Sequence, residues 1–311
     1  MLNTEKIIED TLRVVKKAKP KRILLQAPEG LKTKVKDIAS AIEKQGTKCV
    51  IYADPTYGAC DIPEKTAKMI ECDLILHIGH TNMVGKTTPK TEYVAYFADT
   101  DILTPLKKHA LKLKGIKTIA LATTIQLVKK LPKIKEFLEK QGHKVIIGKS
   151  KNLTYAGQIL GCDPTAATGE NADAILYLGS GTFHPLGITR YTKTPIYVLD
   201  IEKNQLYDLK EERKLYEKKT ILKTIKYNDS KTVGILVSTK KAQFNKNIFK
   251  IKKQIEFEGK KADILVMDNI SPDKIIGMQF DILVNTACPR IEDDLVYDSP
   301  VVNWTTILHS K

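Results

Sequence analysis

Three of the five cysteines stand in segments that could hold a metal centre. Cys60 lies in YGACD, Cys162 in GQILGCD and Cys288 in NTACPRIEDD, each about one hundred residues or more from the next. No CxxC or CxxxCxxC cluster is present, so these thiols can act together only if the fold converges three distant loops. Three thiolates suit a zinc ion that takes one more ligand, from His80 or His184, or an iron–sulfur cube with one open iron.

The other two cysteines are expected to be structural. Cys49 lies inside or at the start of a predicted strand, and Cys72 directly precedes another, at its amino end. Unreactive cysteine behaves as a small buried hydrophobe. We therefore leave both out of the candidate site.

Composition indicates a soluble globular protein. The 311 residues are 42% hydrophobic and 28% charged, without a run of about 18 apolar residues that could span a membrane. The start, MLNTEKIIEDTLRVV, has early acidic residues and no apolar signal core, so we expect a cytoplasmic protein. Five cysteines in such a chain favour metal or catalytic use over a disulfide framework.

The net charge of +15 raises the question of nucleic-acid binding. Lysine is scattered along predicted helices with few interleaved aromatics, which indicates a solvated surface, and we expect no direct nucleic-acid binding. Docking on an acidic or RNA-associated partner is the alternative. The chain has no GxxxxGK[ST] loop and no GxGxxG after an opening strand, which disfavours P-loop and Rossmann nucleotide sites.

An internal repeat organises the chain. The tetrapeptide EKQG occurs at Glu43–Gly46 and again at Glu139–Gly142, and a diverged copy occurs at Glu256–Gly259. A helical pattern precedes each copy and a strand follows it, so the glycine fits a left-handed helix C-cap.

Four apolar strands are expected in each copy. Their predicted ranges are 23–26, 49–53, 73–76 and 93–97, then 119–122, 144–147, 173–176 and 195–199, then 234–237, 263–267, 281–284 and 300–304. Alternating strands and helices predict βαβ units with parallel sheets. We expect three small α/β domains at 1–105, 106–210 and 211–311, and the stretch 202–229 is predicted to be a charged connecting helix that leads into the third domain.

The three candidate cysteines fall at one edge of these sheets. Cys60 and Cys162 both follow the second strand of their repeat and both precede an aspartate, whereas Cys288 ends a third strand. Parallel sheets bind ligands beyond the carboxyl ends of their strands. This placement favours a shared metal site at that edge.

Four other polar residues are placed at the same edge. Gln26 opens the turn QAPEG, Ser180 and His184 lie in GSGTFHPLG, and Arg290 follows Cys288 by two residues. The glycine-rich turn could bind a carboxylate or phosphate through backbone N–H groups, or could be only a tight turn. Arg290 could grip a carboxylate with its guanidinium fork, or form a surface ion pair with Glu292 or a nearby aspartate. The letters HIGH at 77–80 are treated as a chance match to synthetases.

The ordered motifs resemble the archaeal diphthamide-synthesis radical enzymes. These motifs are DPTYGACD, GQILGCD, GSGTFHPLG and NTACPRIEDD, with QAPEGL and HIGHT also in keeping. The resemblance spans about residues 23–304. It implies three domains in a pseudo-threefold triangle around a central [4Fe-4S] cluster held by Cys60, Cys162 and Cys288, with S-adenosylmethionine on the open iron.

The resemblance also implies the activity. The family breaks the bond from sulfur to the γ-carbon of the methionine moiety and transfers the 3-amino-3-carboxypropyl group to a histidine of translation elongation factor 2. This is the first step of diphthamide synthesis. The resemblance further implies that the protein is a homodimer and that it needs an electron donor. Gln26, Ser180, His184 and Arg290 are then candidate pocket residues for S-adenosylmethionine, with Arg290 on its carboxylate.

Two other functions fit the pattern less well. Quinolinate synthase also has three domains and three cysteines on a [4Fe-4S] cluster, used for dehydration, but NTACPRIEDD and FHPLG favour the transferase. A non-enzymatic module with a structural zinc, docked on the translation apparatus, is the alternative of another class.

Overall fold

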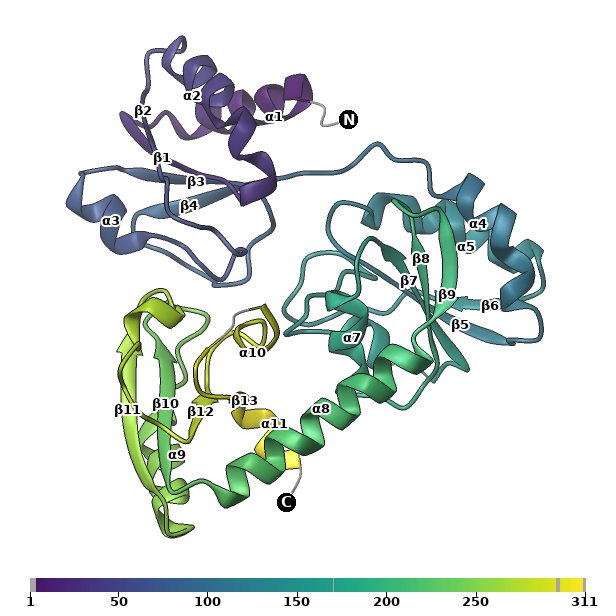
Figure 1. Cartoon of the computed structure of the whole chain (residues 1–311). Helices are drawn as coiled ribbons and strands as arrows, with labels where there is room; N and C mark the ends of the chain where they lie inside the picture. The colour runs from purple at the N-terminus through teal and green to yellow at the C-terminus, as the bar shows by residue number, and fades with distance from the viewer. Residues whose placement is uncertain (1–3, 170, 295–296, 310–311) are drawn as a thin grey trace. The chain divides into compact units, whose positions relative to one another are not determined.

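The chain folds into α/β units with three mostly parallel sheets (Figure 1). The computed structural model describes residues 4–169, 171–294 and 297–309. Two compact units comprise Met1–Leu209 and Lys210–Lys311, so the first unit holds two sheets and the second holds one. Among the described residues, no helix is long and apolar enough to cross a membrane.

The first sheet has the strand order β2-β1-β3-β4, and all its pairs are parallel. Its elements are α1 (Thr4–Ala18), β1 (Arg22–Gln26), η1 (Glu29–Lys34), α2 (Val35–Glu43), β2 (Lys48–Ile51), α3 (Glu64–Met69), β3 (Leu74–Gly79) and β4 (Lys90–Ala95). Alternate residues of β1 face different cores: Ile23 and Leu25 join one cluster, and Leu24 joins another. This sheet is therefore covered on both faces, as its continuous apolar strands predict.

The second sheet has the order β6-β5-β7-β8-β9. Its elements are α4 (Leu103–His109), η2 (Ala110–Leu113), β5 (Thr118–Thr123), η3 (Val128–Lys130), α5 (Leu131–Lys140), β6 (Lys144–Ile146), α6 (Thr165–Thr168), β7 (Ala174–Gly179), α7 (Phe183–Thr189), β8 (Ile196–Asp200) and β9 (Gln205–Asp208). The last strand, β9, pairs antiparallel with β8 and is absent from the sequence prediction.

The third sheet has the order β11-β10-β12-β13, again wholly parallel. Its unit contains α8 (Lys210–Asp229), β10 (Thr232–Ser238), α9 (Ile248–Phe257), β11 (Lys261–Met267), η4 (Pro272–Lys274), β12 (Ile282–Asn285), α10 (Ile291–Asp294), β13 (Val301–Asn303) and α11 (Trp304–His309). The charged helix predicted over 202–229 is shorter than predicted and begins at Lys210, because Gln205–Asp208 instead pairs with β8 and buries Leu206.

The repeat recurs in the packing of α2, α5 and α9. Each of these helices buries residues at positions i, i+3 and i+7, which form one apolar face. The residues are Val35, Ile38 and Ile42 in α2, Leu131, Ile134 and Leu138 in α5, and Ile248, Ile251 and Ile255 in α9. The glycine that follows each helix has a positive φ: 82° at Gly46, 91° at Gly142 and 80° at Gly259. The C-cap role predicted for these glycines follows from that conformation.

A second repeated device joins the first and third strands of each sheet. The carboxylate of Asp73 accepts hydrogen bonds from the backbone N–H of Lys21 and Arg22, both at 2.9 Å. Asp173 accepts from Thr118 at 2.8 Å, and Asp281 accepts from Thr232 at 2.7 Å. Burial alone would raise the pKa of Asp73, but the backbone donors lower it. The aspartates that open the third strands thus fix strand register.

The sequence expectation of an α/β fold with three mostly parallel sheets is confirmed. The expected domain limits of 1–105, 106–210 and 211–311 each enclose one sheet, and their outermost ends, 1 and 311, lie outside the described residues. Each of the three sheets carries one loop that bears a candidate cysteine.

Candidate metal centre

Cys60 occupies the third position of a four-residue turn. The N–H of Asp61 donates to the carbonyl oxygen of Gly58 at 3.1 Å, which closes the turn around the thiol. Gln26, the last residue of β1, lies beneath this turn: its Nε2 donates to the carbonyl oxygen of Asp61 at 2.6 Å and to Thr56 Oγ1 at 3.2 Å. The strand end therefore fixes the position of the Cys60 turn.

Cys162 occupies the same position of an equivalent turn in the second sheet. Leu160 and Asp163 exchange backbone hydrogen bonds of 2.9 and 3.1 Å, which places the exposed Cys162 near the tip. The bridge between Thr123 and Gln158 ties the preceding residues to the end of β5. The two thiols thus stand at the carboxyl edges of their sheets, on turns of one kind.

The Asp163 carboxylate holds the Cys162 turn from within the loop. It accepts hydrogen bonds from Ser150 Oγ at 2.6 Å, from Asn152 Nδ2 at 3.0 Å and from the hydroxyl of Thr165. Burial would raise the pKa of Asp163, but these donors lower it overall. The carboxylate remains ionised and serves as an acceptor that organises the loop.

The segment GSGTFHPLG packs directly on the Cys162 turn. A Cβ added at Gly187 would lie 3.1 Å from the carbonyl oxygen of Gly161, and a Cβ at Gly161 would lie 2.5 Å from the ring of Phe183. Helix α7 can approach the turn this closely only because neither glycine has a side chain. At these two positions the glycines have a packing role.

We expect Gly187→Val to displace the Cys162 turn, because the added side chain meets backbone that cannot move aside cheaply. Overpacking of this kind costs about 1–3 kcal/mol. Thermal unfolding should show the loss, and reconstituted iron per chain should fall with it. Gly30→Val is the matched control, since a Cβ there meets nothing within 4 Å. Equal iron content in both variants would show that the close contact does not position Cys162.

Cys288 lies in a different turn, as its place after a third strand predicts. The turn runs from Cys288 to Ile291, whose N–H donates to the carbonyl oxygen of Cys288 at 3.1 Å. Asn285, the last residue of β12, donates through Nδ2 to the same oxygen at 2.8 Å and accepts from the N–H of Ala287 at 3.0 Å. Asn285 therefore plays the part for Cys288 that Gln26 plays for Cys60.

A buried ion pair anchors the short helix that follows Cys288. The side chain of Glu292 is only 2% exposed, and its two oxygens accept from Lys223 Nζ at 2.9 Å and from the N–H of Asn303 at 3.0 Å. Lys223 belongs to α8 and Asn303 to β13. The Cys288 turn is thus fixed between three elements of the second unit.

Cys49 and Cys72 have the surroundings expected of structural residues. Cys49 packs against the first core cluster, and burial raises the pKa of its thiol to about 12. Cys72 is 4% exposed, and burial likewise raises the pKa of its thiol. A thiol with a raised pKa is a poor metal ligand, because the thiolate is the form that binds.

The other predicted site residues are placed as follows. Gln26 is fully buried, Ser180 is exposed after β7, and Arg290 occupies the third position of the Cys288 turn. The ring of His184, on α7, is stacked 6.3 Å from the ring of Tyr177. Within each of the two units, the described residues contain no group of three His, Cys, Asp or Glu that could hold a metal ion. Cys60 and Cys162 belong to the first unit and Cys288 to the second.

The sequence reasoning missed a polar chain behind the Cys60 turn. Gln26 Oε1 lies 2.7 Å from His77 Nδ1, and His77 Nε2 lies 2.9 Å from His80 Nδ1. Burial lowers the pKa of His77 well below its usual value and lowers that of His80 to about 4. The sequence signal for this chain was a histidine, His77 of the segment HIGH, inside a strand whose residues are all buried.

These two histidines predict acid sensitivity of the fold. Unfolded histidine has a pKa of about 6.5, so between pH 6.5 and 4 the unfolded chain binds more protons than the folded chain. Stability is therefore full above pH 6.5 and falls as the pH approaches 4, by roughly 3 kcal/mol for His80 alone. Urea unfolding across this range measures the loss. His143→Gln, which changes a histidine elsewhere, should keep the pH dependence. An unfolding free energy of the unaltered protein that does not change between pH 6.5 and 4 would contradict the neutral state of His77 and His80.

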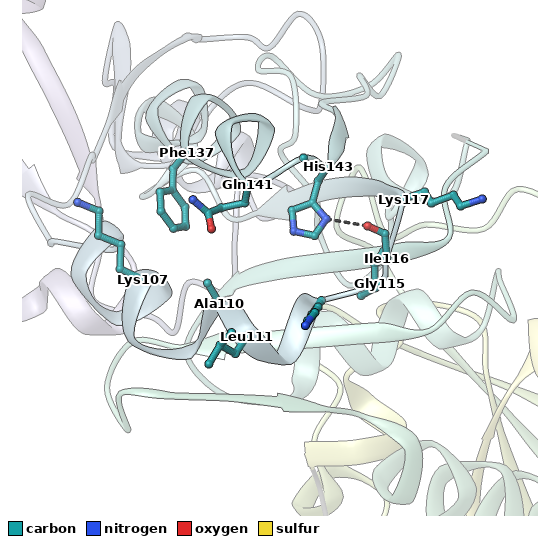
Figure 2. A pocket seen from close by; sticks show the side chains of 11 residues that line it. Lys107, Ala110, Leu111, Gly115, Ile116, Lys117, Phe137, Gln141 and His143 are labelled. Carbon is teal, nitrogen blue, oxygen red and sulfur yellow. Dashed lines mark hydrogen bonds between the residues drawn. The ribbon is translucent and has the colours of Figure 1, made fainter.

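A separate cavity of about 730 Å³ lies at the opposite edge of the second sheet (Figure 2). It is lined by the residues that precede β5 and β6, together with parts of α4, η2 and α5. His143 Nδ1 donates to the carbonyl oxygen of Ile116 at 2.7 Å, as the dashed line shows. None of the predicted site residues lines this cavity.

The fold and the site define a class of protein: a three-sheet α/β chain that presents one cysteine turn at the carboxyl edge of each sheet. The family model described as "Putative diphthamide synthesis protein" matches residues 27–306. The chain belongs to this diphthamide synthesis family, and the resemblance drawn from its motifs is confirmed.

Individual relatives agree with this membership. Two proteins named 2-(3-amino-3-carboxypropyl)histidine synthase are each 32% identical to the chain. The similarity to the Pyrococcus horikoshii protein extends over 92% of this chain and 83% of that protein. The similarity to the Methanocaldococcus jannaschii protein extends over 96% of this chain and 86% of that protein. Two crystal structures of Dph2 from Pyrococcus horikoshii match with a TM-score of 0.90 at 29% identity. They cover 99% and 100% of this chain and 89% and 91% of the crystallised chains, and the second contains a 4Fe-4S cluster.

Proposed function

We propose that this protein is a 2-(3-amino-3-carboxypropyl)histidine synthase. It transfers the 3-amino-3-carboxypropyl group of S-adenosylmethionine to a histidine of translation elongation factor 2, in the first step of diphthamide synthesis. The observation that carries the proposal is the set of three accessible cysteine turns at strand ends. The relatives that bear this enzyme's name are similar to the chain over most of their own length.

The donor set fits an iron–sulfur cluster. Cys60, Cys162 and Cys288 are partly or fully exposed, and each is held by hydrogen bonds to the turn backbone, so their sulfur atoms are available and positioned. Three thiolates would leave one iron open for S-adenosylmethionine. When bound, the cluster supplies the electron that breaks the bond from sulfur to the γ-carbon.

The remaining groups of the proposed pocket come from the turns themselves. Arg290 would hold the substrate carboxylate, and Ser180 and His184 of the GSGTFHPLG segment would contribute further polar groups to the proposed pocket. Gln26 would act through the Cys60 turn, since its side chain is buried and donates to the carbonyl oxygen of Asp61. A pseudo-threefold triangle of domains, a homodimer, an electron donor and a cytoplasmic location complete the proposal.

Product analysis tests this function. The anaerobically reconstituted protein, a reductant and S-adenosylmethionine should yield methylthioadenosine, which reports cleavage at the γ-carbon. Release of 5′-deoxyadenosine instead would contradict the proposed bond. No cleavage product, together with quinolinate formed from dihydroxyacetone phosphate and iminoaspartate, would support the dehydratase alternative.

Metal analysis separates the non-enzymatic alternative. Iron and acid-labile sulfide in anaerobically purified protein support the cluster. Zinc without iron or sulfide would instead support a structural zinc module and exclude the transferase.

A further inference from the structure

The buried chain behind the Cys60 turn has only one consistent arrangement of hydrogens. A backbone carbonyl accepts only, so the contact of 2.6 Å with the carbonyl oxygen of Asp61 fixes the NH₂ end of the Gln26 amide. The amide oxygen is then the atom 2.7 Å from His77 Nδ1. Because that oxygen also accepts only, His77 Nδ1 carries the hydrogen.

The same logic continues to His80. His77 is fully buried and neutral, so its Nε2 has a lone pair and no hydrogen. His80 Nδ1, 2.9 Å away, must therefore donate to it. Since His80 is neutral as well, its Nε2 is left with a lone pair. The protein thus selects the Nδ1–H form of both rings and turns His80 Nε2 into an acceptor.

His80 stands at the carboxyl edge of the first sheet, the edge to which the Cys60 turn is attached. It directly follows β3, next to β1 and its Gln26. Its neighbour Thr81 accepts a hydrogen bond through Oγ1 from Gln158 Nε2 at 3.4 Å. Gln158 precedes Cys162 by four residues. His80 is therefore connected to the Cys60 turn through His77 and Gln26. It is connected to the Cys162 loop through the hydrogen bond of the adjacent Thr81.

We propose that His80 Nε2 accepts a hydrogen bond from the ring N–H of the histidine that receives the transferred group. This inference rests on the proposed function and names a residue that recognises its protein substrate. Gln26 and His77 are positioning residues, because they act by holding His80 in the accepting form.

The surroundings of His80 favour an aromatic, neutral donor. The ring of His80 lies 5.1 Å from the ring of His77, which in turn lies 5.5 Å from the ring of Tyr93, so His80 is one member of a cluster of three aromatic rings. Such faces suit a planar imidazole. A neutral nitrogen acceptor matches a neutral N–H, whereas an ammonium group is better matched by a carboxylate.

Separate measurement of cleavage and transfer tests the role of His80. The His80→Phe variant removes the acceptor and keeps a ring. We expect methylthioadenosine release within about twofold of the unaltered protein, and transfer to elongation factor 2 reduced about tenfold, the equivalent of one hydrogen bond of about 1.4 kcal/mol. His143→Phe makes the same substitution at a histidine outside the proposed pocket and controls for general damage, and thermal unfolding checks that both variants fold.

A spectroscopic arm reports the hydrogen arrangement without activity. ¹⁵N spectra of the histidine-labelled full chain, with its cluster oxidised, should show both rings in the Nδ1–H form, and Gln26→Leu should shift them towards the Nε2–H form. Unchanged spectra in Gln26→Leu would overturn the positioning role. Unchanged transfer in a folded His80→Phe protein would overturn the proposal, as would equal losses of cleavage and transfer, which would place Nε2 on the cofactor. Failure of the unaltered protein to cleave S-adenosylmethionine would refute the proposed function itself.

Discussion

Cys60→Ala, Cys162→Ala and Cys288→Ala are each expected to lose most of the iron and sulfide that the unaltered protein binds. Each thiol stands on its own turn, at least partly accessible, and the turns come from three different sheets. No second cysteine lies in the same turn to replace the missing ligand. Reconstitution followed by iron and sulfide analysis measures the effect.

The chain supplies its own controls in Cys49→Ala and Cys72→Ala. Burial raises the pKa of both thiols, and Cys72 is enclosed in a core cluster, so neither is available as a thiolate. Both variants should keep the cluster and lose only some stability. If Cys72→Ala lost the cluster while Cys162→Ala kept it, the register assigned to the repeat would be wrong.

Lys223→Met should destabilise the second unit by about 3 kcal/mol. The substitution preserves the length of the side chain but leaves the Glu292 carboxylate, 2% exposed, without its cation. Loss of one partner of a buried pair costs about 3–5 kcal/mol, and the 24% exposure of Lys223 favours the lower end. Because Glu292 anchors the helix next to Cys288, iron retention should also decrease. Urea unfolding and iron content measure the two effects.

Lys214→Met is the matched control on the same helix. Lys214 lies 2.8 Å from Glu211, but both side chains are more than half exposed, and such pairs contribute about 0–1 kcal/mol. We expect a change below about 0.5 kcal/mol. Similar losses in the two variants would show that the Glu292 pair is no more than a surface ion pair.

The sheets could be predicted because their signals are local and repeated. Apolar runs and the EKQG glycines mark β1, β5 and β10 and the helices after them. Strand β9 could not be predicted, because an antiparallel partner for β8 is defined by the tertiary pairing that buries Leu206. The segment QLYD has only one aliphatic residue, so its sequence gives no clear strand pattern.

The site was only partly readable from sequence. The cysteines and their order were visible, as was the placement of each after a strand. The chain from Gln26 to His80 was not, because it joins residues 51 positions apart through the alignment of β1 and β3. Likewise, the glycines of GSGTFHPLG suggested an anion site, whereas Gly187 serves close packing against Gly161.

Mass spectrometry of translation elongation factor 2 tests the central claim most directly. The reconstituted protein should be incubated anaerobically with the factor, S-adenosylmethionine and a reductant, and the factor digested. We predict a mass increase equal to one 3-amino-3-carboxypropyl group on a single histidine, absent with Cys162→Ala. An unmodified factor, from a protein shown to carry its full complement of iron and sulfide, would contradict the account.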